Sequence, residues 1–197
     1  MKIVVFGSTG MIGSRIATEL EQRGHDVVGA SRATGTDITD PVSVADAVAG
    51  ADAVVSAVSA RGVDYTLTDV ARSCVDGLRG AGVKRLVIVG GASSLEVAPG
   101  VRLLDTPDFP DEFKAEAAQG VDALAFFQSI SDLDWTYVSP AAFIHPGERT
   151  GRYRLDEDKL LVDENGNSEI SAEDYAIAIA DLLEQEAHAH TRVAVGW

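Results

Sequence analysis

Three glycines stand three residues apart near the start of the chain, in the loop formed by Gly7, Ser8, Thr9, Gly10, Met11, Ile12 and Gly13. An apolar run precedes this loop and an amphipathic stretch follows it, so the loop joins a predicted strand to a predicted helix. The free amides and the dipole at a helix N-terminus attract phosphate. The pattern is therefore typical of dinucleotide binding, although a close helix–strand crossing without a ligand would also use glycines.

Each glycine of the loop has its own predicted role. Gly7 permits the tight turn, because glycine has no Cβ atom, and Gly10 permits the close approach of a pyrophosphate. Gly13 allows the helix to pack against the strand. We expect residues 7–13 as a whole to bind the cofactor.

The second predicted strand ends at Ser31-Arg32, where such folds contact the adenosine ribose. An acidic side chain there favours NAD, whereas an arginine accommodates the 2′-phosphate of NADP. Arg32 therefore predicts NADP(H) in preference to NAD(H), the alternative being a solvent-exposed arginine on an acidic protein. We expect Asp37 and Ile38 to lie beside the adenine. Asp37 could equally accept a hydrogen bond from the adenine amine or cap a turn.

Further site residues follow from the rule that ligands lie outside the carboxyl ends of parallel strands. We expect segments that follow three later strands to line the nicotinamide end of the cleft, namely residues 57–60, 90–94 and 139–143. Within them, the residues expected to contact the cofactor are Ala57, Val58, Ser59, Pro140 and Ala141.

A hydride acceptor would lie beyond the nicotinamide, beside the long polar loop 92–111. Ser93 or Ser94 could donate a hydrogen bond to it, or could satisfy the loop backbone in a serine turn. Phe109, Phe143 and Arg149 could form the walls for an aromatic acceptor, although packing is the favoured interpretation for each aromatic side chain taken singly. His145 is interpreted as a surface histidine, and no residue is assigned as catalytic.

These residues need elements that position them, and strands alternate regularly with helices along the chain. Strands are predicted at 2–6, 26–31, 51–59, 84–91, 133–141 and 192–197, and helices at 11–23, 41–48, 65–78, 112–131 and 171–184. The strands are apolar on both faces, which indicates a parallel sheet with helices on each side. We predict one Rossmann-like, doubly wound α/β domain over residues 1–197. Short segments at 143–171 form a small C-terminal region on the substrate side.

Five segments together carry a resemblance to a known family: "GSTGMIG", "GGAS", "LDWTYVSPAAF", "PGERTGRYRL" and "ISAEDYA". From end to end the chain resembles the atypical short-chain dehydrogenase/reductases, and specifically the bacterial proteins labelled Rrf2-linked NADH-flavin reductases. That family is similar in fold to biliverdin reductase B, a flavin reductase, and to the NmrA-like redox-sensing regulators. The resemblance implies an NAD(P)-binding Rossmann fold.

One feature of the wider superfamily is missing, namely the Tyr-x-x-x-Lys pair that passes a proton to a substrate carbonyl. Four positions after the tyrosines at 65, 137, 153 and 175 stand Asp69, Ala141, Glu157 and Ile179. Ordinary carbonyl reduction through such a tyrosine is therefore disfavoured. A flavin or quinone acceptor does not need the pair, because its proton can come from water.

Two functions follow from these observations. The first is an NADPH-dependent oxidoreductase that transfers a hydride to a flavin such as FMN or FAD, to a quinone or to a similar small aromatic acceptor. The second is a non-enzymatic NADP(H)-sensing regulator of the NmrA-like type, in which the oxidised and reduced cofactor change the affinity for a partner.

The composition excludes several other classes. A net charge of −15 disfavours nucleic acid and anionic membranes as partners. The chain has no targeting segment and no apolar run long enough to span a bilayer, so we expect a cytoplasmic monomer or homodimer. The four histidines are scattered, so no metal is expected. Cys74 is interpreted as a small apolar residue in a helix.

Overall fold

The computed structural model describes residues 1–185 and 188–197. Within them, a seven-stranded sheet has the order β2-β1-β3-β4-β7-β11-β9. Its strands are β1 (Lys2–Phe6), β2 (Asp26–Ala30), β3 (Ala53–Ser56), β4 (Arg85–Val89), β7 (Asp134–Pro140), β11 (Thr191–Gly196) and β9 (Arg154–Asp156). All neighbouring strands run parallel except β9, which pairs antiparallel with β11 at the edge.

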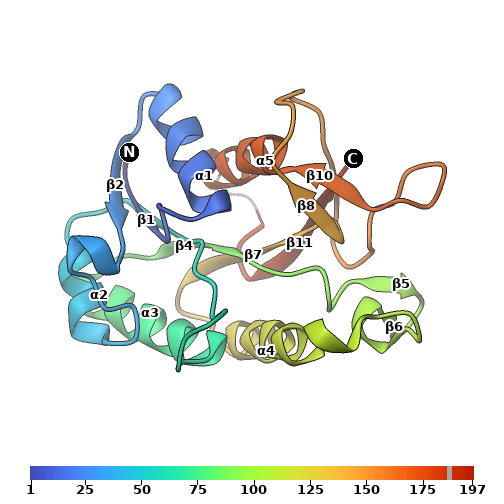
Figure 1. The fold of residues 1–197 in the computed structure, drawn as a ribbon. Coiled ribbons are helices and arrows are strands. Elements are labelled where there is room, and N and C mark those ends of the chain that lie inside the picture. Colours follow the sequence, from blue (N-terminus) through green and yellow to red (C-terminus); the bar gives the residue numbers. More distant parts are fainter. Residues whose placement is uncertain (186–187) are drawn as a thin grey trace.

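Helices cover both faces of this sheet (Figure 1). On one face lie α1 (Met11–Gln22) and α5 (Ala172–Glu184); on the other lie α2 (Pro41–Val48), α3 (Leu67–Ala81) and α4 (Asp111–Gln128). Successive residues of β1 supply the two cores, since Val4 and Phe6 pack beneath α2 and α3 whereas Ile3 and Val5 pack beneath α1 and α5. The predicted doubly wound α/β fold is confirmed.

The strand order reverses at β1, because β2 lies on one side of it and β3 on the other. The loop after β1 leads to α1 on one face, and the loop after β3 leads to α3 on the opposite face. Such a switch point leaves a crevice at the carboxyl ends of the two strands. The glycine loop, residues 7–10, therefore lies where an open α/β sheet binds its ligand.

Side-chain caps fix several helix starts. The Asp40 carboxylate accepts hydrogen bonds from the amides of Val42 and Ser43 at the start of α2. Thr66 and Asp69 form a reciprocal capping box, which is why α3 begins at Leu67 and not at residue 65 as predicted. The predicted strand 51–59 was also too long, because only Ala53–Ser56 pairs with both neighbours.

The small C-terminal region predicted at residues 143–171 contains short strands that pair in different sheets. Its strand β9 extends the main sheet, whereas β8 (Phe143–His145) pairs in parallel with β10 (Glu169–Ser171). Loop 92–111 was predicted to lack strands, but it contains the hairpin of β5 (Glu96–Ala98) and β6 (Val101–Arg102). Short 3₁₀ helices occur at Arg32–Thr34 and Leu103–Asp105.

Among the helices in the described part of the chain, none is both long and apolar enough to cross a membrane.

Candidate functional site

The glycine loop is held in a tight turn against the end of β3. Gly7 has a φ of +75°, and a Cβ atom built on it would lie 2.3 Å from the carbonyl oxygen of Ala57. A Cβ on Gly13 would lie 2.2 Å from the carbonyl oxygen of Gly7. Both positions therefore exclude any side chain, as the predicted roles of these two glycines require. Gly10 has more room, because its Cβ would lie 3.3 Å from that same oxygen.

The loop leaves a group of backbone amides without acceptors. The amide of Gly7 donates to Ala30 O and that of Gly10 donates to Gly7 O. Among the described residues no acceptor faces the amides of Ser8, Thr9, Met11, Ile12 and Gly13. The first turn of α1 also has no acidic side chain. These donors at a helix N-terminus fit the diphosphate of a dinucleotide.

The end of β2 offers further donors beside the loop. The Ser31 hydroxyl is buried and has no hydrogen-bond partner among the described residues. Arg32 is exposed, and within residues 1–185 and 188–197 its guanidinium has neither an ion pair nor a hydrogen bond. Gly29 lets the Ser8 side chain lie against β2, since a Cβ there would come within 2.6 Å of Ser8 Oγ. Sequence reasoning did not single out Ser31 or Gly29 as site residues.

Asp37 adopts one of the two arrangements left open for it. Its carboxylate caps a turn by accepting hydrogen bonds from the Thr39 hydroxyl at 2.7 Å and the Thr39 amide at 2.9 Å. These hydrogen bonds hold the pKa of Asp37 below its ordinary value. Ile38 is buried in the core beneath α2 and α3. Contact of either residue with adenine stays a prediction.

The residues predicted beside the nicotinamide lie at the carboxyl ends of β3 and β7. The Ala57 amide donates to Phe6 O at the end of β1, so the segment after β3 lies beside the start of the glycine loop. Ser59 accepts a hydrogen bond from the Arg61 amide. Pro140 and Ala141 are buried where β7 ends. Their contacts with a cofactor also stay predictions.

The two serines predicted near the acceptor have partners in the protein. Ser93 Oγ donates to Ala117 O at 3.2 Å, and Ser94 Oγ accepts from the Arg192 guanidinium at 2.9 Å. Both residues are buried. Their hydroxyls therefore hold the loop after β4 against α4 and β11, and neither forms the serine turn considered from the sequence.

Phe109, Phe143 and Arg149 are not brought into mutual contact. Phe109 is half-buried before α4, whereas Phe143 is 58% exposed on β8 and lies 4.9 Å from the His145 ring between centroids. Arg149 forms a two-bond ion pair with Glu19, in the middle of α1. It lines a groove between α1 and α5, away from the acceptor side. His145 is half-buried between Phe143 and Trp197, so its interpretation as a surface residue was only partly correct.

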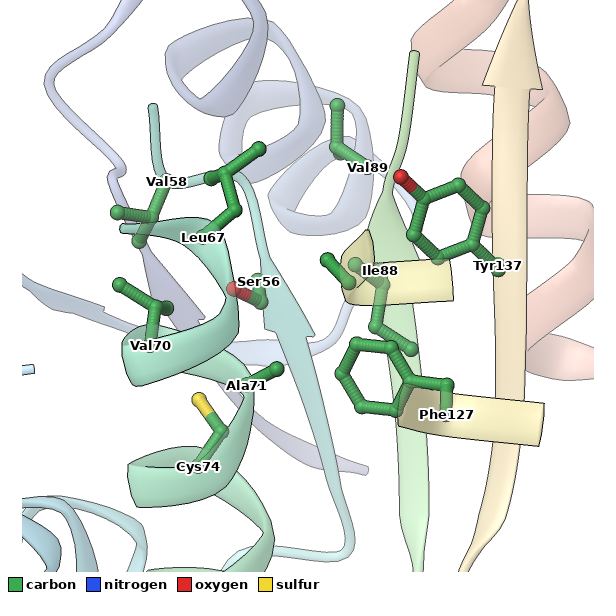
Figure 2. Close-up of a pocket in the computed structure, with 11 residues that line it drawn as sticks. Ser56, Val58, Leu67, Val70, Ala71, Cys74, Ile88, Val89, Phe127 and Tyr137 are labelled. Carbon is green, nitrogen blue, oxygen red and sulfur yellow. The ribbon is translucent and has the colours of Figure 1, made fainter. Parts of the chain in front are cut away.

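A small hollow of about 30 Å³, room for about one water molecule, lies between α3 and α4, beneath the carboxyl ends of β3 and β4 (Figure 2). Its lining consists of Ser56, Val58, Leu67, Val70, Ala71, Cys74, Ile88, Val89, Ala123, Phe127 and Tyr137. Of these, sequence reasoning placed only Val58 in a site. Gly90, in the segment 90–94 predicted to line the cleft, lies beside this hollow, and a Cβ there would lie 2.1 Å from the Tyr137 ring.

Tyr137 and Cys74 are both buried in this hollow. Burial raises the pKa of Tyr137 to about 12, and its hydroxyl donates to Gly120 O at 3.1 Å. Burial likewise raises the pKa of the Cys74 thiol to about 12, so the interpretation of Cys74 as a small apolar residue is confirmed. Neither group is an acid or a nucleophile near neutral pH. The described residues contain no cluster of His, Cys, Asp and Glu that could hold a metal ion.

Comparison with known proteins agrees with the glycine-loop geometry. Residues 7–186 match the sequence model of a family described as NAD(P)H-binding. The chain belongs to this family. The family assignment confirms the resemblance to the atypical short-chain dehydrogenase/reductases at the level of fold and cofactor type.

Several known proteins align with this chain over almost the full length of both. "Uncharacterized protein YwnB" from Bacillus subtilis is 36% identical, with 99% of this chain and 98% of that protein covered. A "putative exported protein" from Burkholderia pseudomallei is 48% identical with a TM-score of 0.92, and both chains are covered completely. A "putative NADH-flavin reductase" from Streptococcus pneumoniae is 33% identical with a TM-score of 0.86, covering 100% of this chain and 99% of that one.

Proposed function

We propose that the protein is an NADPH-dependent oxidoreductase that transfers a hydride to a flavin, a quinone or a similar aromatic acceptor. The observation that carries this proposal is the group of free amides at the start of α1, beside glycines that exclude side chains. Those donors fit a dinucleotide diphosphate. The relative from Streptococcus pneumoniae, named a "putative NADH-flavin reductase", supports the reaction class.

A bound reduced nicotinamide supplies two electrons and one proton as a hydride, and a second proton from water completes reduction of a quinone to a quinol or of a flavin to its dihydro form. The residues of the chain bind and orient the two partners. The glycine loop holds the diphosphate, and the ends of β3 and β7 direct the nicotinamide towards the acceptor.

NADPH is proposed in preference to NADH because of the end of β2. Arg32 is exposed, and its guanidinium is free of other partners in the described part of the chain. A free guanidinium at this position suits a phosphate monoester.

We propose that water supplies the proton to the acceptor. The hydroxyls of three tyrosines already donate hydrogen bonds within the protein, and no tyrosine has a lysine four residues later. Tyr175 donates to Val138 O at 2.6 Å and Tyr153 donates to Asp181, in addition to the bond from Tyr137 described above. Tyr65 has Asp69 four residues later. No Tyr-x-x-x-Lys pair is therefore available to protonate a carbonyl.

The direct test is anaerobic oxidation of NADPH by the pure protein with FMN, FAD and neutral quinones as acceptors. The proposal predicts turnover that depends on both protein and acceptor. Binding of NADPH without turnover on any acceptor would contradict it and would favour the alternative, a non-enzymatic NADP(H)-sensing regulator. A regulator would bind its partner with different affinities in the presence of NADPH and NADP⁺.

A further inference from the structure

The main chain that follows β4 passes through Gly90 and Gly91 and is half-exposed at the carboxyl ends of the strands. Ligands of open α/β sheets lie at these ends, so the turn stands where we expect the nicotinamide. Position 90 has no room for a side chain, because a Cβ atom there would meet the Tyr137 ring. The turn therefore offers main-chain atoms to a ligand.

The Gly90 carbonyl is an unused acceptor. The Gly90 amide donates to Val138 O at 2.8 Å, and in a regular parallel ladder the amide two residues further along β7 would donate back to Gly90 O. That residue is Pro140, which has no amide hydrogen. In the described part of the chain nothing donates to Gly90 O. A primary carboxamide, such as that of nicotinamide, carries the N–H donors that this oxygen lacks.

Two buried tyrosines hold this turn, one from each face of the sheet. Tyr137 belongs to the core beneath α2 and α3, and Figure 2 shows its hydroxyl beside the end of β4. That hydroxyl donates to Gly120 O on α4 at 3.1 Å, and the Gly91 amide donates to it. Tyr137 therefore ties the turn to the helix that covers it.

Tyr175 reaches the turn from α5, on the opposite face of the sheet. Its hydroxyl donates to Val138 O at 2.6 Å, the same oxygen that accepts the Gly90 amide. Both tyrosines are buried, so neither can touch a cofactor. Each acts through the backbone of the turn.

We propose that Gly90 O accepts a hydrogen bond from the nicotinamide carboxamide, and that Tyr137 and Tyr175 are positioning residues that hold this oxygen in place. This inference rests on the proposed NADPH-dependent function and deepens it, because it assigns the group that recognises the nicotinamide. A turn that is free to move would lose part of that interaction.

The test compares NADP⁺ with 2′-phospho-ADP-ribose, which lacks only the nicotinamide. Calorimetric titration measures both affinities in Tyr137→Phe and Tyr175→Phe, which keep the buried ring and remove the hydroxyl. We expect each variant to bind NADP⁺ about three- to tenfold more weakly, as the loss of one hydrogen bond implies, and to bind 2′-phospho-ADP-ribose unchanged. Tyr175→Phe leaves Val138 O with its bond from the Gly90 amide, so this variant should fold.

Tyr153→Phe is the matched control, because it removes a tyrosine hydroxyl that donates to Asp181 on α5. It should change neither affinity. Unchanged NADP⁺ binding in folded Tyr137→Phe and Tyr175→Phe would overturn the inference. An equal loss for the two nucleotides would also overturn it, because a general disturbance of the fold weakens both alike.

Nuclear magnetic resonance on the unaltered protein keeps the test independent of the variants. The carbonyl carbon resonance of Gly90 should shift on addition of NADP⁺ and stay in place with 2′-phospho-ADP-ribose. Identical shifts with the two nucleotides would overturn the inference and leave the oxidoreductase function standing. No binding of either nucleotide would refute that function, and the inference with it.

Discussion

At the scale of single residues, Arg32 decides the predicted choice of cofactor. Replacing it with glutamine removes the charge that we assign to the 2′-phosphate. A hydrogen bond to a charged group contributes about 1.5–3 kcal/mol, so the preference for NADPH over NADH should fall roughly tenfold to a hundredfold. The measurement is titration of both cofactors into the unaltered and Arg32→Gln proteins.

Arg152→Gln is the matched control, because Arg152 is also exposed and its guanidinium has no partner among the described residues. We expect it to leave the ratio of the two affinities unchanged. An unaltered ratio in Arg32→Gln as well would show that the ribose site was placed wrongly.

The geometry that sequence predicts well depends on near neighbours in the chain. Gly7, Gly10 and Gly13 lie within seven consecutive residues between the end of β1 and the first turn of α1, and Arg32 stands two residues after β2. The contact of Arg32 with a 2′-phosphate stays a prediction. Arg149 was assigned to the acceptor side, but its partner Glu19 is 130 residues away in sequence. Such an ion pair depends on tertiary packing, which no local pattern shows.

At the scale of elements, the buried carboxylate of Asp174 joins three separate segments. It accepts hydrogen bonds from Thr150 Oγ1, from the Gly151 amide and from Trp197 Nε1 while its own amide is capped by Ser171. Asp174→Ala removes the charged acceptor of these part-buried donors, and a hydrogen bond to a charged group contributes about 1.5–3 kcal/mol. We expect urea denaturation to show a loss of at least about 3 kcal/mol.

The control for this change is Asp122→Ala, which removes an exposed carboxylate from α4. Its stability should lie within about 0.5 kcal/mol of the unaltered protein. Equal stability of the Asp174 and Asp122 variants would mean that the carboxylate does not hold these segments together.

The contact between α1 and the segment after β8 should depend on pH. Hydrogen bonds from Arg149, with a further contribution from Arg23, hold the pKa of Glu19 below its ordinary value of 4.5 although burial opposes them. Because the pKa is lower in the folded state, the stabilisation is complete above that ordinary value and is lost as the pH falls through the folded value. Glu19→Gln should therefore be less stable at neutral pH, with the difference shrinking below pH 4.5.

Urea denaturation between pH 7 and pH 3 measures this difference. Glu112→Gln, which changes an exposed carboxylate on α4, should show no comparable effect. Parallel stability curves for Glu19→Gln and the unaltered protein across the acid range would show that the Glu19 carboxylate is not the source of this pH dependence.

The helices and the parallel strands were recognised as elements because of their apolar periodicity, although α3 and α4 differ from their predicted limits at both ends. The limits of α2 and of β1 agree with the prediction, and α5 ends at the predicted residue. The short strands depend on distant partners instead. For example, the Glu96 amide in β5 donates to Asp158 O, and the Leu160 amide donates back to Glu96 O. Strands of two or three residues carry too little periodicity to be recognised from sequence.

At the scale of the whole molecule, the two apolar cores share one sheet. Alternate residues of β1 enter opposite cores, so neither core can form without the strand that serves both. We propose that residues 1–197 are a single domain, and that the protein is a monomer or homodimer in the cytoplasm. Calorimetric unfolding should then show one cooperative transition, coincident with loss of helix measured by circular dichroism. Two separated transitions would contradict the single domain.

The central claim is that the amides of the glycine loop bind the diphosphate of NADPH, and calorimetric titration tests it most directly. We expect one NADPH to bind per chain of the unaltered protein. Gly10→Ala, whose methyl group lies 3.3 Å from Gly7 O and whose backbone suits alanine, should stay folded and bind NADPH at least tenfold more weakly. No heat of binding with any nicotinamide nucleotide, or unchanged affinity in folded Gly10→Ala, would contradict the account.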